Sequence, residues 1–221
     1  MTANFSHDLE TAMTMQQSVT RTETTPASSL SLPVLRGAHA TLRELRAGDA
    51  ASLFELLTAP EVARFIAEPP TTVEGFEQFI ARVNFQRSGG KYACFAVTLK
   101  DDDTAIGLFQ LRELEPGFKT AEWGFAIGSM FWGTGLFQES ARLLLEFAFG
   151  QLGIHRLEAR AAVRNGRGGR ALQKVGAVPE GVLRKSFRRS GQYLDQVLYA
   201  IVEDDWRAAR ETRSRALPLA H

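Results

Sequence analysis

The clearest chemical signature in this sequence is Trp132–Phe137, where two glycines stand immediately before a long amphipathic helical pattern. Glycines in that position expose a row of backbone N–H groups, and the helix dipole adds partial positive charge at the same end. Exposed N–H groups at a helix N-terminus form an anion site. The segment therefore predicts a turn that binds a phosphate group.

Three kinds of phosphate site use such a turn. A dinucleotide-binding turn needs a third glycine directly after the first strand, whereas Gly133 and Gly135 lack that partner and lie past the middle of the chain. A triphosphate loop needs Gly-Lys-Ser/Thr before the helix, where this chain has Leu136 and Phe137 after the glycine. The third kind holds the pyrophosphate of an acyl-CoA with backbone amides and requires no lysine.

Glu122 is the candidate general base, because it lies on the predicted strand that leads to this turn. It alternates with Trp123 and Phe125, so it faces away from the apolar side of the strand. Partial burial makes a glutamate more basic and suits it to taking a proton. A solvated glutamate, or one held in an ion pair, would give the same pattern, so these interpretations stay open.

The elements that must position these groups alternate along the chain. Asp49 is expected to cap a first helix, and Thr71 with Glu74 has the spacing of a capping box for a second. Hairpins combined with one strand–helix–strand crossover predict a mixed α/β sheet. The expected strands span residues 40–45, 92–99, 105–112, 120–127, 155–163, 181–188 and 193–202. Of the expected helices, one follows Asp49 and carries Leu53, Leu56 and Leu57, one runs from Thr71 to the glycines at 89–90, and two span about 136–152 and 167–175.

Taken in order, these residues resemble the GNAT (Gcn5-related N-acetyltransferase) superfamily, and within it the RimJ/RimL-like acetyltransferases. The strand at 121–127 and the turn at 131–136 match the core of the superfamily. The resemblance covers about residues 36–207, and its specificity comes from the order of the matches. Further matches are Leu42–Leu45, Asp49, Asn165, Gly168, Leu172, Lys174, Gly176, Glu180–Arg184, Gly191–Asp195, Leu198, Tyr199, Asp205 and Trp206.

The resemblance implies an α/β (α+β) GNAT fold. We expect a mixed, mostly antiparallel twisted sheet of about six to seven strands, flanked by about four helices, with a splayed central parallel strand pair. The domain is expected over residues 36–210, between a flexible or loosely ordered N-terminal tail, 1–35, and a C-terminal tail, 211–221. The polar composition of Ser18–Ser31 independently favours a tail.

The resemblance also implies a function, because GNAT enzymes transfer an acetyl group from acetyl-CoA directly to an amine. Acetyl-CoA is then the co-substrate, and the acceptor is a protein N-terminal amine or a small-molecule amine. Glu122 takes the proton of the amine. The acceptor is expected to be set by the loops around Phe65–Arg87 and by the closing hairpin. The implied cofactor-binding residues are Phe125, Ala126, Ile127, Trp132, Gly133, Thr134, Gly135, Leu136, Phe137 and Asn165.

Three positions depart from the pattern of the family. Phe137 stands where a small residue usually closes the turn, so its ring would crowd the cofactor or pack into the core. Gly168 and Leu172 replace the usual serine and tyrosine, which removes the usual proton donors to the leaving thiolate, and Tyr199 or water would have to substitute. These departures motivate the alternative of a non-catalytic acyl-CoA-binding GNAT-like module.

Composition limits the remaining possibilities. The 221 residues suffice for one domain, and a net charge of +1 predicts no affinity for nucleic acid or membranes. The single cysteine, Cys94, excludes an intrachain disulfide and, with no signal peptide recognised, fits the cytoplasm. Four histidines without ligand spacing predict no metal site. The resemblance implies a monomer or a homodimer.

Overall fold

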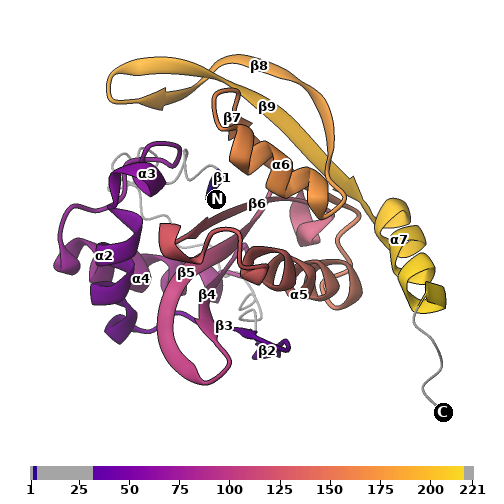
Figure 1. The fold of residues 1–221 in the computed structure, drawn as a ribbon, viewed down its shortest axis with the longest axis horizontal. Helices are drawn as coiled ribbons and strands as arrows, with labels where there is room; N and C mark the ends of the chain where they lie inside the picture. Colours follow the sequence, from indigo (N-terminus) through magenta and orange to yellow (C-terminus); the bar gives the residue numbers. More distant parts are fainter. Residues whose placement is uncertain (1, 4–31, 217–221) are drawn as a thin grey trace, which may run out of the picture.

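The computed structural model describes residues 2–3 and 32–216. Its nine described strands form one twisted sheet in the order β2-β3-β4-β5-β6-β7-β9-β8, with β1 paired to β6 outside this order (Figure 1). All neighbouring strands are antiparallel except β6 and β7, which are parallel. The strands are β1 Thr2–Ala3, β2 Leu35–Arg36, β3 Ala40–Glu44, β4 Tyr92–Leu99, β5 Asp102–Glu113, β6 Thr120–Ile127, β7 Arg156–Ala162, β8 Val178–Arg189 and β9 Gln192–Val202.

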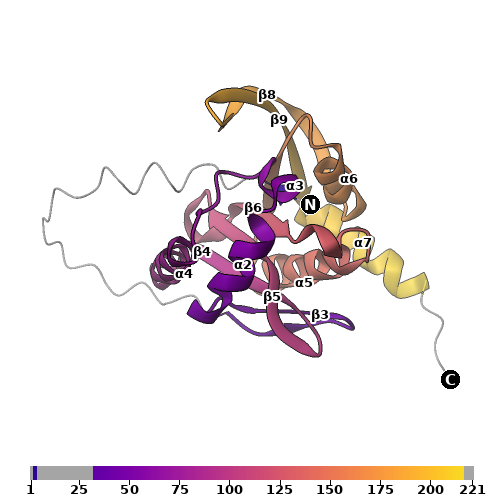
Figure 2. The ribbon, with the colours of Figure 1, turned by 60° about the vertical axis from the view of Figure 1, so that its left-hand side comes forward.

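Helices cover both faces of this sheet (Figure 2). On one face, Leu144 of α5 packs with Phe125 of β6 in one cluster of buried residues. On the other face, Phe76 of α4 and Leu53 of α2 pack with Leu108 of β5. The described helices are α2 Ala50–Leu57, α3 Pro60–Ala63, α4 Val73–Ser88, α5 Leu136–Gly150, α6 Gly166–Lys174 and α7 Glu203–Ala216, with 3-10 turns at Ala47–Asp49, Pro116–Phe118 and Ser129–Phe131.

The structure confirms the predicted fold class, including the central parallel pair. Strands β4 and β6 begin and end at the predicted residues, because their apolar alternation is uninterrupted. The sheet has more strands than expected. The short β2 was missed because it shows no alternation of apolar and polar residues. Helices α3 and α7 were not predicted, and α7 continues past residue 210, where we expected the domain to end. The predicted N-terminal tail falls mostly on residues 4–31, outside the described residues.

Two predicted helix caps are wrong. Helix α4 is capped by Thr72, whose side chain accepts a hydrogen bond from the backbone N–H of Gly75. We had assigned this role to Thr71, one residue earlier, because both threonines precede acidic helical sequence. Asp49 precedes α2 but makes no side-chain cap to it.

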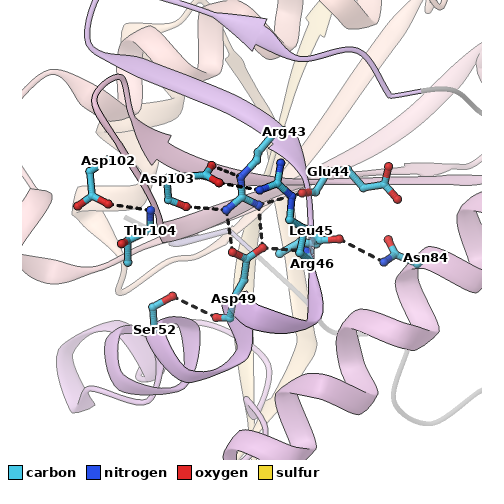
Figure 3. Close-up of polar contacts among 10 residues, drawn as sticks. All are labelled: Arg43, Glu44, Leu45, Arg46, Asp49, Ser52, Asn84, Asp102, Asp103 and Thr104. Atoms are coloured by element: carbon cyan, nitrogen blue, oxygen red, sulfur yellow. Dashed lines mark hydrogen bonds and ion pairs between the residues drawn. The ribbon is translucent and has the colours of Figure 1, made fainter.

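The carboxylate of Asp49 instead binds Arg43, which is buried in β3 (Figure 3). Both terminal nitrogens of Arg43 lie 2.8 Å from the Asp49 oxygens, and Nη2 also donates to the backbone carbonyl of Asp103 at 2.6 Å. The hydrogen bond to Asp49 raises the pKa of Arg43 above its ordinary value. Through these bonds Arg43 joins β3 to the residue before α2 and to the start of β5, so it helps to hold α2 against the sheet.

None of the helices within the described residues is long and apolar enough to span a membrane.

Candidate functional site

The two parallel strands separate partway along their length. Strands β6 and β7 pair only over Thr120–Glu122 and Arg156–Glu158. Beyond that point the edge of β6 pairs antiparallel with Thr2–Ala3, opposite Phe125 and Ala126. The edge of β6 at these residues therefore accepts an extended polypeptide in place of its parallel neighbour.

The glycine turn follows directly at the end of β6. Gly133 and Gly135 adopt left-handed conformations, with φ of +83° and +91°, that other residues rarely adopt. Gly135 is the N-cap of α5, so the free N–H groups of the first helical turn begin here. The indole Nε1 of Trp132 donates to the carbonyl of Ile127 at 2.8 Å, and the hydroxyl of Thr134 donates to the carbonyl of Phe131 at 2.8 Å. These bonds hold the turn against the strand end.

The ring of Phe137 packs into the core and leaves the turn clear. Phe137 is 3% exposed, and its ring centroid lies 4.5 Å from that of Phe125 and 5.7 Å from that of Phe109. The backbone N–H of this residue still belongs to the first turn of α5. Of the two outcomes left open for this side chain, the structure shows packing into the core.

Helix α6 begins opposite the glycine turn. Asn165 is buried and caps this helix, since its Oδ1 accepts the N–H of Gly168 at 2.9 Å. Arg167, in the first turn of α6, places its guanidinium 4.8 Å from the ring centroid of Trp132. The structure therefore brings the first turn of α6 to the glycine turn, as the predicted cofactor site requires. No local pattern of residues predicts the contact that Arg167 makes with Trp132.

Glu122 lies in a network of ion pairs that the sequence left unspecified. Its side chain is 12% exposed and binds the guanidinium of Arg112 through Oε2 and Nη1 of Arg160 through Oε1, the latter at 2.5 Å. Arg160 also pairs with Glu158 at 3.4 Å, and Glu158 with Arg156 at 3.0 Å. The two guanidinium groups orient the Glu122 carboxylate and stabilise its charge.

Sequence reasoning missed both arginine partners of Glu122. Arg112 faces Glu122 in the antiparallel register of β5 and β6, so pairing the predicted hairpin residue by residue would have found it. Arg160 lies 38 residues away on β7 and depends on the crossover, for which no local signal exists. The ion pair that remained open as an interpretation of Glu122 is thus present.

Tyr199 lies close to the substituted positions of α6. Leu172 is fully buried in the core, so the position of the family's tyrosine is apolar here. The Tyr199 hydroxyl lies 2.5 Å from where a Cβ on Gly169 would stand, so only glycine admits it. Burial raises the pKa of Tyr199, which keeps its hydroxyl protonated at neutral pH. Within the described residues, no group of three or more His, Cys, Asp or Glu could hold a metal ion.

Comparison with known proteins identifies the same architecture. The sequence model of the acetyltransferase (GNAT) domain matches residues 39–178. The chain is 27% identical over 165 residues to the uncharacterized N-acetyltransferase YnaD of Bacillus subtilis, covering 75% of this chain and 94% of that protein. It is 26% identical over 137 residues to the [ribosomal protein uS5]-alanine N-acetyltransferase of Escherichia coli, covering 62% and 71%. A GCN5-related N-acetyltransferase from Brucella melitensis has the same fold, with a TM-score of 0.73 and 21% identity over 88% of this chain and 90% of that one.

Proposed function

Because this chain belongs to the GNAT acetyltransferase family, we propose that it transfers an acetyl group from acetyl-CoA directly to a primary amine. The acceptor is a protein N-terminal amine or an amine on a small molecule, and the alanine N-acetyltransferase of ribosomal protein uS5 supports the first class. One observation carries the proposal: the parallel strands β6 and β7 separate directly before a two-glycine turn.

Acetyl-CoA supplies the activated acetyl thioester, and the edge of β6 beyond its pairing with β7 fits the pantetheine arm. Pantetheine is an extended chain with two amides, and this edge already pairs with an extended backbone at Phe125 and Ala126. The backbone groups of Phe125, Ala126 and Ile127 would hold the arm. One edge cannot pair with two chains at once, so Thr2–Ala3 must leave when the arm binds.

The N–H groups from Gly133 to Phe137 would hold the pyrophosphate, because they stand at the positive end of α5. The turn itself contains no basic side chain, and Arg167 brings a guanidinium to its edge. Trp132 shapes the turn through its bond to the strand end, and Asn165 positions α6 by capping it. These residues together make up the proposed cofactor site.

Glu122 is proposed to accept the proton of the attacking amine. Its carboxylate is largely buried beside the point where β6 and β7 separate, and two arginines hold it in place. A positioned carboxylate can take a proton directly or through one water molecule. The ion pairs with Arg112 and Arg160 fix the orientation of this carboxylate before the amine arrives.

A non-catalytic acyl-CoA-binding module remains the second candidate function. One observation favours it, since Gly168 and the buried Leu172 offer no hydroxyl where the family has proton donors. The side chain of Phe137 no longer supports this alternative, because it packs in the core.

Two measurements separate these functions. Isothermal titration with CoA tests the cofactor site, and release of free thiol from acetyl-CoA over a panel of amines and N-terminal peptides tests transfer. We expect CoA binding together with acceptor-dependent thiol release. Binding without turnover on any acceptor would favour the module, and absence of CoA binding would exclude both functions.

A further inference from the structure

We infer that the acceptor carries a large apolar group, aromatic or branched aliphatic, next to its amine, and that this group enters a hollow on the Glu122 side of the sheet. This inference rests on the proposed function, because it names the class of acceptor for the same site.

The hollow lies between the α3–α4 connection, helix α4 and the sheet. It has a cavity volume of about 50 Å³ and opens to solvent. One water needs about 10–15 Å³ of such volume, so a branched aliphatic group or the edge of an aromatic ring can enter the hollow, whereas an alanine methyl group would leave most of it to water. The wall is mostly apolar and consists of Leu57, Ile66, Ala67, Glu68, Pro69, Pro70, Phe76, Phe79, Arg82, Val83, Gln86, Tyr92 and Leu108.

The hollow lies on the same face of the sheet as Glu122. Tyr92, which lines the hollow, lies directly opposite Arg112 in the pairing of β4 with β5, and Arg112 holds Glu122. Leu108, another lining residue, is followed by Gln110 and Arg112 at every second position of β5, so all three side chains lie on one face of the sheet. An acceptor with its apolar group in the hollow therefore has its amine on the face that Glu122 occupies.

Two segments that are distant in sequence meet at Glu68, one of the lining residues. The tip of the β8–β9 hairpin extends toward α3 (Figure 1), where the N–H of Ser190 donates to Glu68 Oε1 at 3.2 Å. Arg189 pairs with the same oxygen at 3.2 Å. These are the two loop regions expected to set the acceptor, and they meet at this point.

The charges of the hollow argue against a polycationic acceptor. Glu68 is the only acidic side chain in the lining, and Arg189 balances its charge. Arg82, also in the lining, adds positive charge and stacks against Phe79 at 5.9 Å. A polyamine would meet more positive than negative charge here. The hollow therefore attracts an acceptor mainly by burying its apolar surface.

The test compares amino-acid amides that differ only in side chain, with spermidine added as a polycationic amine. Phenylalaninamide and leucinamide are assayed against alaninamide and spermidine with saturating acetyl-CoA. We expect kcat/KM to be about tenfold to a hundredfold higher for the two apolar acceptors than for alaninamide, because burying such a side chain is worth about 1.5–3 kcal/mol. A peptide beginning with phenylalanine, compared with phenethylamine, then distinguishes a polypeptide acceptor from a small molecule.

Two matched variants localise the effect. Ala67→Leu adds an isopropyl group inside the hollow, whereas Ala209→Leu adds the same group beside a separate hollow of about 30 Å³ at α5 and α7. We expect Ala67→Leu to lower the ratio of kcat/KM for phenylalaninamide to that for alaninamide about tenfold, while CoA affinity stays unchanged. Ala209→Leu should leave the preference intact.

The outcomes separate this inference from the proposed function. Equal kcat/KM for all acceptors, or an unchanged preference in Ala67→Leu, overturns the inference while acetyl transfer stands. If no amine is acetylated, the proposed function fails, and binding of phenylalaninamide measured by calorimetry still decides the inference. Saturable binding of phenylalaninamide would support the apolar site if Ala67→Leu weakens it and Ala209→Leu leaves it unchanged. Absence of binding would overturn the inference.

Discussion

The ring of Phe137 packs against the ring of Phe125 with their centroids 4.5 Å apart, so the residue that closes the glycine turn belongs to the core. Phe125 lies on the strand whose edge is proposed to hold pantetheine, and Phe137 lies in the first turn of the helix proposed to hold pyrophosphate. Their contact therefore fixes the strand and the helix of the cofactor site relative to each other.

Replacing Phe137 with alanine should destabilise the fold. We expect Phe137→Ala to lose about 3–5 kcal/mol in the free energy of unfolding, because it leaves a cavity beside Phe125 and Phe109. Urea unfolding followed by circular dichroism measures this loss. Phe85→Ala, which removes a ring that is 79% exposed, is the control and should have little effect. An alanine variant as stable as the original, with tighter CoA binding, would show that the ring crowds the cofactor instead.

The left-handed conformation of Gly135 should be required for CoA binding. An alanine at φ of +91° is strained by about 1–2 kcal/mol, so Gly135→Ala should lose stability and shift the amides of the turn. We expect CoA affinity to fall about tenfold in isothermal titration. Gly150→Ala, in the same helix with ordinary φ and open space around it, should leave CoA affinity unchanged. Equal affinities of the two variants would argue against pyrophosphate binding at this turn.

Removing the charge of Glu122 should slow acetyl transfer. Glu122→Gln is expected to lower turnover at neutral pH about a hundredfold or more, since the amide cannot take a proton, while CoA affinity stays intact. Glu158→Gln, which removes a carboxylate from the same network of arginines, is the matched control. Steady-state kinetics and titration with CoA measure both effects. If Glu122→Gln turns over like the unmodified enzyme, Glu122 has no part in the mechanism.

The buried pair of Arg43 and Asp49 should be necessary for stability. Arg43→Met is expected to cost about 3–5 kcal/mol in the free energy of unfolding, because it leaves the Asp49 carboxylate buried without its partner. The double variant Arg43→Met with Asp49→Leu should recover much of that loss, as no buried charge is left. Arg46→Met removes a side chain that is 61% exposed and should cost at most about 1 kcal/mol. Additive effects of Arg43→Met and Asp49→Leu would contradict this coupling.

Glu139 should contribute to the loss of stability in acid. Burial tends to raise its pKa, but hydrogen bonds from the N–H groups of His39 and Ala40 outweigh that effect and lower the pKa below the ordinary value of 4.5. A carboxylate with a lowered pKa in the folded state stabilises the fold above the ordinary value, and this stabilisation is lost as the pH falls through the lowered pKa.

The pH dependence can be isolated by substitution. Between about pH 5.5 and about pH 3.5, Glu139→Gln should lose less stability than the unmodified protein, because it lacks this carboxylate. Urea midpoints at the two pH values measure the difference. Glu146→Gln, an exposed position on the same helix, should keep the full acid sensitivity. An identical pH slope for Glu139→Gln would refute the assigned role.

The sequence alone determined the central elements and their order, although it did not predict β1, β2, α3 or α7. Strands β4 and β6 were predicted to the residue, and the glycine turn was located at the start of α5. These features follow from apolar periodicity and from the conformational freedom of glycine. Both are local properties, set by residues that are close together in the sequence. The choice of Thr72 over Thr71 as a cap was missed, because both threonines suit the position locally and packing decides between them.

The tertiary structure decided which groups meet. The partners of Glu122 come from β5 and β7, the ring of Phe137 turns toward Phe125, and Arg167 of α6 reaches Trp132 in the glycine turn. The hollow proposed for the acceptor combines two helices, two strands and a connection. Such contacts depend on strand register and on how helices pack across the sheet. Those are long-range properties, so no local pattern of residues encodes them.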